Sequence, residues 1–109
     1  MLHVRVEQRD GSLVVTPLAP RLDAEAALEL RTHVAALVSG RQRVVLSLEH
    51  VASMDGSGLA ALIALLKAMP PGGELRLAHA GASIRALLAR TRLDELFPEV
   101  DESPAAARE

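Results

Sequence analysis

The sequence predicts an α/β fold in which a mixed β-sheet packs against helices. Three observations support this prediction. The chain opens with two strand-like segments on either side of Asp10-Gly11, a favoured hairpin turn. Two later strand-like segments, 44–48 and 74–79, are each followed by a segment whose apolar residues recur at helical spacing. Finally, 50% of the 109 residues are hydrophobic, which is enough for one domain to bury its own core.

The opening hairpin is predicted from alternation. Every second residue from 2 to 6 is apolar, the pattern of a half-buried strand, and 13–18 returns as a second strand after the turn. Pro17 and Pro20 end the pairing because proline has no backbone N–H to donate. We therefore expect an antiparallel hairpin near an edge of the sheet.

The first helix is expected to begin after Asp23, a residue type that caps helix N-termini well. Ser39-Gly40 would end it, since glycine is the commonest C-terminal stop. Its predicted inner face follows the helical period and consists of Ala27, Leu30, Val34 and Leu37.

Residues 43–68 carry the strongest functional signals. Val44 to Leu48 has the valine- and leucine-rich composition of a central parallel strand, with alternate residues on opposite faces. A loop then leads to Asp55-Gly56-Ser57-Gly58 and a second helix. The predicted inner face of this helix consists of Leu59, Leu62, Ile63 and Leu66.

The other side of this second helix is also apolar. Ala60, Ala61, Ala64 and Leu65 lie away from the predicted inner face, and Lys67 is the only charged residue between 57 and 68. Burial on both sides of a helix is difficult in a domain of this size. We therefore expect these residues to form a contact surface for a partner.

Ser57, between two glycines at a helix start, has three interpretations. It could cap the helix, a role that Asp55 could equally fill. It could be the nucleophile of a serine hydrolase, although Asp55 does not fit G-x-S-x-G and a base such as His50 would have to lie near. It could also be a regulatory phosphoacceptor, exposed where free N–H groups and the helix dipole favour anions. The residues alone leave these interpretations open.

The last third of the chain repeats the strand-to-helix order. Residues 69–73 form a proline- and glycine-rich break before the strand at 74–79. Ser83 is expected to cap a third helix, followed by an extra turn at 93–97. The inner residues of this helix are predicted to be Ile84, Leu87 and Leu88. We expect one domain over 1–100 and a short helical or frayed tail over 101–109.

Composition excludes several classes of function. Phe97 is the only aromatic residue and the net charge is −2, so neither base stacking nor phosphate binding suggests a nucleic-acid partner. Four scattered histidines and no cysteine predict no metal site. No catalytic carboxylate pair or phosphate-cradling loop is recognisable, so we expect neither an enzyme nor a cofactor. The N-terminus lacks a signal-peptide pattern and no stretch could insert in a bilayer, which favours a cytoplasmic location.

The segment from Val44 to Leu48, followed by Met54-Asp55-Gly56-Ser57-Gly58-Leu59, resembles the core motif of STAS domains. This is the family of bacterial anti-sigma factor antagonists. Arg21-Leu22-Asp23 and the strand start at 73–77 match as well, so the resemblance covers about residues 2–100. It implies a STAS-like mixed sheet, with an opening antiparallel hairpin, then βα units, and helices on one face.

The resemblance also implies a function. In this family a partner kinase phosphorylates the residue before the glycine-leucine pair, here Ser57. The unmodified chain would bind an anti-sigma factor with serine kinase activity and free a sigma factor. The expected partner-binding residues are Asp23, Asp55, Gly56, Gly58, Ala61, Ala64 and Leu65. An alternative is an unphosphorylated STAS adaptor, for example in a bacterial lipid-transport ABC complex. Whether the chain pairs with a second copy stays open.

Overall fold

Residues 3–97 and 99–100 are described by the structure, a computed structural model, with side chains as far as residue 97. The expected tail at 101–109 lies outside the described residues. The elements follow one another as β1 (Val4–Arg9), β2 (Ser12–Pro17), β3 (Arg21–Leu22), α1 (Ala24–Val38), β4 (Arg43–Ser47), β5 (Ser53–Met54), α2 (Gly56–Ala68), β6 (Glu74–Ala78), α3 (Ala82–Arg90), the 3₁₀ turn η1 (Leu93–Glu95) and β7 (Glu99–Val100).

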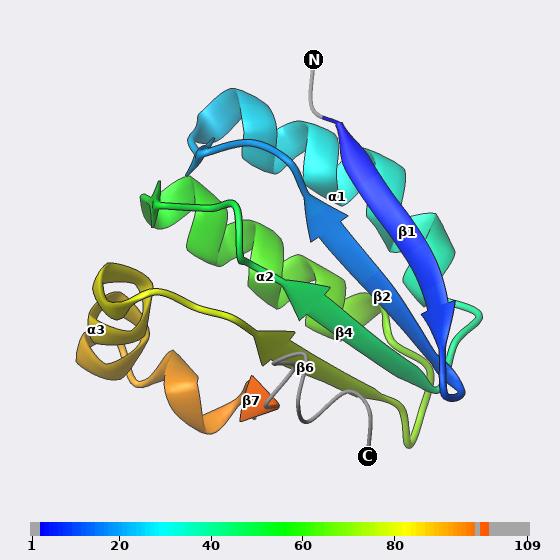
Figure 1. Cartoon of the computed structure of the whole chain (residues 1–109). Helices are drawn as coiled ribbons and strands as arrows, with labels where there is room; N and C mark the ends of the chain where they lie inside the picture. Colours follow the sequence, from blue (N-terminus) through cyan, green and yellow to red (C-terminus); the bar gives the residue numbers. More distant parts are fainter. Residues whose placement is uncertain (1–2, 98, 101–109) are drawn as a thin grey trace.

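The main sheet is mixed and has the strand order β1-β2-β4-β6-β7 (Figure 1). β1 and β2 are antiparallel, whereas β2, β4, β6 and β7 are parallel. The hairpin turn is made by Asp10 and Gly11, whose φ angles of 51° and 81° are both positive. Such angles suit aspartate and glycine in a two-residue hairpin turn. The predicted mixed sheet with an opening antiparallel hairpin is confirmed.

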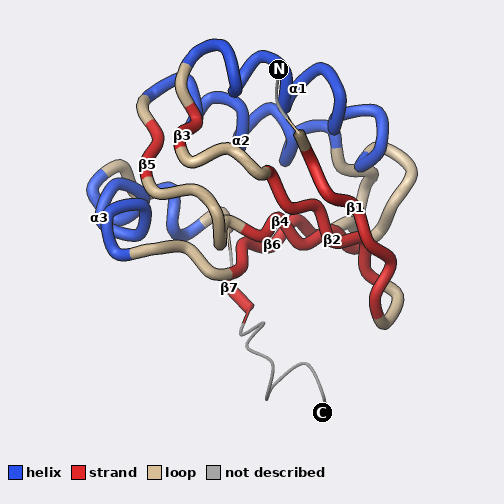
Figure 2. Tube along the Cα trace, turned by 45° about the horizontal axis from the view of Figure 1, so that its top comes forward, coloured by secondary structure: helices blue, strands red, loops and turns tan. Residues whose placement is uncertain are grey.

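The helices α1 and α2 cover one face of this sheet, and α3 lies at one end (Figures 1 and 2). Alternate residues of β4 divide between the two faces as predicted. Val44, Leu46 and Leu48 join the main core under the helices, while Val45 belongs to a small cluster on the opposite face. The helices on one face, expected from the STAS resemblance, are confirmed.

The inner face of α1 differs from the prediction at its last residue. Ala27, Leu30 and Val34 are buried as expected, but Leu37 is 41% exposed and Val38 takes its place in the core. At about 100° per residue, Val38 lies about 40° round the helix from Val34, whereas Leu37 lies about 60° away on the other side. The assignment of Leu37 to the inner face is therefore wrong.

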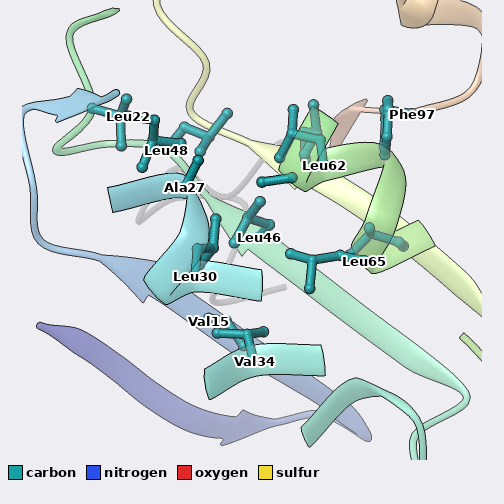
Figure 3. Packing of buried hydrophobic residues seen from close by; sticks show 14 of the residues in the cluster. Val15, Leu22, Ala27, Leu30, Val34, Leu46, Leu48, Leu62, Leu65 and Phe97 are labelled. Carbon is teal, nitrogen blue, oxygen red and sulfur yellow. The ribbon is translucent and has the colours of Figure 1, made fainter. Parts of the chain in front are cut away.

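The orientation of α2 differs more. Its buried residues are Gly58, Leu59, Ala61, Leu62 and Leu65, whereas Ile63 and Leu66 are partly exposed. Ala61 and Leu65 have no exposed surface, and Figure 3 shows Leu65 among the packed core side chains. The physical reason is that α2 packs against both the sheet and the neighbouring α1, so two sides of it are covered. The expectation that Ala61 and Leu65 face outward is therefore wrong.

The third helix begins at Ala82, two residues earlier than it would with Ser83 as its N-cap. Its N-cap is Gly81, and the Ser83 hydroxyl instead donates a hydrogen bond of 2.9 Å to the carbonyl oxygen of Ala52. This bond ties α3 to the loop between β4 and β5. Ile84 and Leu88 are buried as predicted, and Leu87 is partly buried. Among the described residues, no helix is long and apolar enough to cross a bilayer.

Candidate functional site

The N-termini of α1 and α2 lie together at one end of the sheet, joined by the two-stranded parallel sheet β3–β5. The Ala52 N–H donates to the Pro20 carbonyl oxygen over 2.7 Å, and the Asp55 N–H points to the Leu22 carbonyl oxygen at 3.5 Å. These bonds hold the segment before α2 against the segment before α1. In open α/β sheets, the carboxyl ends of parallel strands are the usual place for binding sites.

The start of α2 is capped by Asp55. Its backbone is extended, and its Oδ1 accepts hydrogen bonds from the N–H groups of Ser57 (2.9 Å) and Gly58 (3.3 Å). The Asp55 carbonyl oxygen accepts the first bond of the helix, from Leu59 N–H at 3.1 Å. Asp55 thus satisfies two of the N–H groups that a helix start leaves free. The cap is Asp55, so Ser57 is not the capping residue.

Ser57 is the second residue of α2 and is partly exposed. Its backbone N–H is used by the cap, but its hydroxyl makes no hydrogen bond within the part of the chain that the structure describes. The side chain therefore holds no other element in place. Its hydroxyl is available at the surface, at the positive end of the helix dipole.

The two glycines around Ser57 have different environments. Gly58 is buried, and a Cβ atom there would lie 2.8 Å from the Met54 Cβ and 3.0 Å from the Leu22 carbonyl oxygen. Only glycine lets α2 come this close to β3 and β5. Gly56 is exposed, and a Cβ atom there would meet nothing within 4 Å. Space therefore requires glycine at 58 and leaves position 56 free to vary.

The start of α1 is capped in the same way by Asp23, whose Oδ1 accepts from the Ala26 N–H at 3.0 Å. A hollow of about 390 Å³ lies beside it. Its lining combines three carboxylates with one guanidinium and consists of Ala19, Pro20, Arg21, Asp23, Glu25, Ala26 and Glu29. The end of the sheet that carries Ser57 thus also presents exposed negative charge.

The structure separates the predicted partner-binding residues into two groups. Asp23, Asp55 and Gly56 are exposed, and Ala64 is partly exposed. The remaining three are buried and out of reach of a partner: Gly58, Ala61 and Leu65.

Ala60 was placed away from the inner face of α2 by the sequence but was not among the expected partner-binding residues. Ala60 and Ala64 follow Ser57 at i+3 and i+7, so the three share one side of α2, and Ala60 is exposed. Helical spacing counted from Ser57, rather than from the leucines, separates Ala60 and Ala64 from the buried Ala61 and Leu65. We call Asp23, Asp55, Gly56, Ser57, Ala60 and Ala64 the helix-start surface.

Among the described residues, no contact of Ser57 meets the requirements of the hydrolase interpretation. His50 lies in the loop after β4, with its Nε2 3.2 Å from Glu49 Oε2. Within the described ranges, no hydrogen bond joins a histidine to Ser57. Nor do the described residues include a group of three or more metal-ligating side chains close enough to hold an ion.

Comparisons with known proteins agree with this geometry. A family model described as STAS domain matches residues 3–107. Among curated proteins, no sequence matches the chain. An anti-sigma-factor antagonist (STAS) domain protein from Planctomyces limnophilus is similar in structure, with a TM-score of 0.85 and 22% identity over 99% of this chain and 97% of that one.

Two further solved structures are also similar. An anti-sigma factor antagonist from Mycobacterium paratuberculosis has a TM-score of 0.83 and 24% identity, over 99% of this chain and 92% of that one. The Bacillus cell fate determinant SpoIIAA, solved in its phosphorylated form, has a TM-score of 0.70 and 16% identity, over 97% of this chain and 96% of that one. At these identities the likeness shows the fold.

Proposed function

Because the chain belongs to the STAS domain family, we propose that it is an anti-sigma factor antagonist whose binding is gated by phosphorylation of Ser57. The unmodified protein binds an anti-sigma factor that is also a serine kinase, and thereby frees a sigma factor. The observation that carries the proposal is the state of Ser57: it is partly exposed at the start of α2, and Asp55, not its hydroxyl, caps the helix. The function belongs to the cytoplasm, where sigma factors act.

Phosphorylation of Ser57 would add about −1.5 to −2 charges at neutral pH. A helix start stabilises a negative group by about 0.3–1 kcal/mol, which favours the phosphate within the domain. The Asp55 carboxylate, whose Oδ1 is 2.9 Å from the Ser57 nitrogen, repels it. These two effects oppose each other, so the modification changes the stability of the free domain little.

At a docked interface the same phosphate would have to lose its water. Burying an unpaired charge costs several kcal/mol, which is far more than the stabilisation of the phosphate by the helix dipole. The helix-start surface is otherwise suited to close contact, because Ala60 and Ala64 are small and Gly56 has no side chain. The phosphate therefore acts by electrostatic rejection of the partner, without refolding of the domain.

The proposal is tested by incubating the protein with a cognate anti-sigma kinase and ATP, followed by mass spectrometry. We expect one phosphate, on Ser57, and none on Ser57→Ala. Ser53→Ala is the matched control, since Ser53 is exposed in the neighbouring β5 and should leave phosphorylation unchanged. Ser57→Asp should bind the kinase more weakly than the parent protein. Phosphate on Ser53 or Ser47 with Ser57 untouched, or full binding by Ser57→Asp, would contradict the proposal.

The two alternatives make different predictions. A STAS adaptor would bind its partner equally well with or without Ser57→Asp, and no feature of the structure favours it over the antagonist. A serine hydrolase would turn over an activated ester in a Ser57-dependent way, and we expect no such turnover above background because no base is hydrogen-bonded to Ser57 among the described residues.

A further inference from the structure

The first strand, β1, has a free long edge. In the described part of the chain it pairs with β2 alone, over six consecutive positions from Val4↔Pro17 to Arg9↔Ser12. No glycine, proline or bulge interrupts it, although such features commonly protect strand edges. A regular edge of this kind can accept another strand.

The backbone groups on this edge can be identified from one hydrogen bond. The Leu18 N–H donates to the His3 carbonyl oxygen over 2.8 Å, so the backbone groups of His3 point toward β2. Successive residues of an antiparallel strand point their N–H and C=O groups to opposite sides. Those of Arg5, Glu7 and Arg9 therefore also point to β2. The free edge carries the groups of Val4, Val6 and Gln8.

The side chains of β1 divide between the two faces of the sheet. Val6 is paired with Val15, whose side chain lies in the core under the helices, so Val6 faces the helix layer. It is nevertheless 44% exposed. Arg5 and Glu7 face the opposite, open side, where their side chains are 48% and 41% exposed. The edge thus offers the exposed Val6 on one face and the charged residues Arg5, Glu7 and Arg9 on the other.

Two copies of β1 can pair antiparallel about a two-fold axis perpendicular to the sheet, and charge together with the length of strand overlap selects the register. Centring the axis on Arg5 or on Glu7 places like charges opposite each other. Centring it on Val4 places Arg5 opposite His3. Centring it on Gln8 pairs Glu7 with Arg9 of the second copy, but it shortens the overlap and places Val6 opposite the turn residue Asp10. Centring it on Val6 places Val6 opposite Val6 of the second copy, and Arg5 opposite Glu7 of the second copy, twice.

The same register also matches the backbone. With the axis at Val6, the directly opposed pairs on the free edge are Val6 with Val6, and Val4 with Gln8 of the second copy. These are the residues whose N–H and C=O groups point outward, so each pair can exchange two hydrogen bonds. Backbone geometry alone allows centres at Val4, Val6 and Gln8. The centre at Val6 combines the two Arg5–Glu7 pairs with the longest overlap of the two strands.

We propose that this chain forms a homodimer through antiparallel pairing of β1 with β1 of a second copy, centred on Val6. The two five-stranded sheets become one continuous sheet, with both helix layers on the same side. Arg5 and Glu7 are already close within one strand, with Arg5 Nε 3.8 Å from Glu7 Oε1, and both are half exposed. Exchange of partners across the axis therefore costs them little desolvation.

The dimer leaves the helix-start surface open. α2 packs on α1, β5 and β6, whereas β1 packs on β2, at the edge of the sheet. A dimer of this kind presents two copies of Ser57, so it would bind two partner molecules.

The test is sedimentation equilibrium of the full chain from about 1 μM to about 1 mM, the range of weak and moderate interfaces. We expect the mass to rise from 11.6 kDa toward twice that value. Arg5→Glu opposes two pairs of carboxylates across the axis, and Glu7→Arg two pairs of guanidinium groups. Each should weaken the dimer about ten-fold or more.

The double variant Arg5→Glu/Glu7→Arg restores opposite charges in the same register and should dimerise as the parent does. An equimolar mixture of the two single variants should form heterodimers, because each supplies the charge that the other needs. Unchanged melting temperatures would show that all four proteins are folded. A monomeric parent at every concentration, or single variants that dimerise like the parent, would overturn the proposal. Binding of an extended peptide without self-association would assign the edge to a different partner and overturn it as well.

Discussion

The starts of α1 and α2 are built on the same plan. Each follows a two-residue strand of the β3–β5 pair, and each begins at an aspartate in extended conformation, Asp23 or Asp55. In each, Oδ1 of the aspartate accepts a hydrogen bond from the N–H three residues later, at Ala26 (3.0 Å) or Gly58 (3.3 Å). The two caps therefore share this bond, and Asp55 accepts a second one from the Ser57 N–H at 2.9 Å.

The residues between cap and third position differ. α1 continues with Ala24, Glu25 and Ala26, so its first turn carries an acidic group that suits the helix dipole. α2 continues with Gly56, Ser57 and Gly58 and has no acidic group in its first turn. The aspartate caps thus stabilise both helix starts. The first turns differ, because α2 has the neutral hydroxyl of Ser57 where α1 has the favourable charge of Glu25. A phosphate on Ser57 would supply the missing charge.

If α2 differs from α1 only in this first turn, the buried residues of α2 should contribute to the free energy of unfolding as those of α1 do. Leu65→Glu places a carboxylate at a fully buried position. We expect a loss of about 4 kcal/mol or more in the free energy of unfolding, or an unfolded protein. Lys67→Glu, at an exposed position of the same helix, is the matched control and should change it little. Urea unfolding followed by circular dichroism measures both. A stable Leu65→Glu that lost only partner binding would restore the idea that this side is a docking surface.

Substituting alanine for each of the two glycines of α2 should change the stability of the domain in opposite directions. At Gly58 the new Cβ would lie 2.8 Å from Met54 Cβ and 3.0 Å from a backbone oxygen, so we expect a loss of about 1–3 kcal/mol. At Gly56 there is open space, and alanine should stabilise the helix by about 0.5 kcal/mol. Thermal unfolding of the two variants measures the difference. Equal effects at both positions would show that α2 does not need its close approach to β3.

The equivalence of the caps can be tested by removing each in turn. Asp23→Ala and Asp55→Ala should each lower the free energy of unfolding by about 1 kcal/mol, because each leaves helix N–H groups without an acceptor. Asparagine at either position keeps an acceptor oxygen and should recover most of the loss. A much larger effect at Asp55 alone would mean that the two helix starts are not equivalent.

The smallest effect is expected at Ser57. Since its hydroxyl makes no hydrogen bond among the described residues, Ser57→Ala should change the free energy of unfolding by less than about 0.5 kcal/mol. The same substitution should abolish phosphorylation. A destabilisation comparable to that of Asp55→Ala would assign Ser57 a structural role and weaken the proposed switch.

Sequence reasoning succeeded where the signal is local. The Asp10-Gly11 turn, the two faces of β4 and the cap at Asp23 are all present, since each depends on neighbouring residues in the chain. Of the two capping candidates that the sequence left open before α2, the structure has Asp55. It failed at Ser83, which was predicted to cap α3 because serine is a common N-cap residue. That hydroxyl donates to Ala52, which is 31 positions away, and no local pattern contains this contact.

The sequence by itself determined the order of the elements, the mixed sheet and the serine at the start of α2, because turns, caps and strand alternation follow from the backbone geometry of short segments. Only the tertiary structure decided how α2 is rotated about its axis. Leucines, alanines and an isoleucine surround most of this helix, so periodicity gives it no single inner side. Contact with α1 made the choice: it buried Ala61 and Leu65, and it left Ser57, Ala60 and Ala64 at the surface.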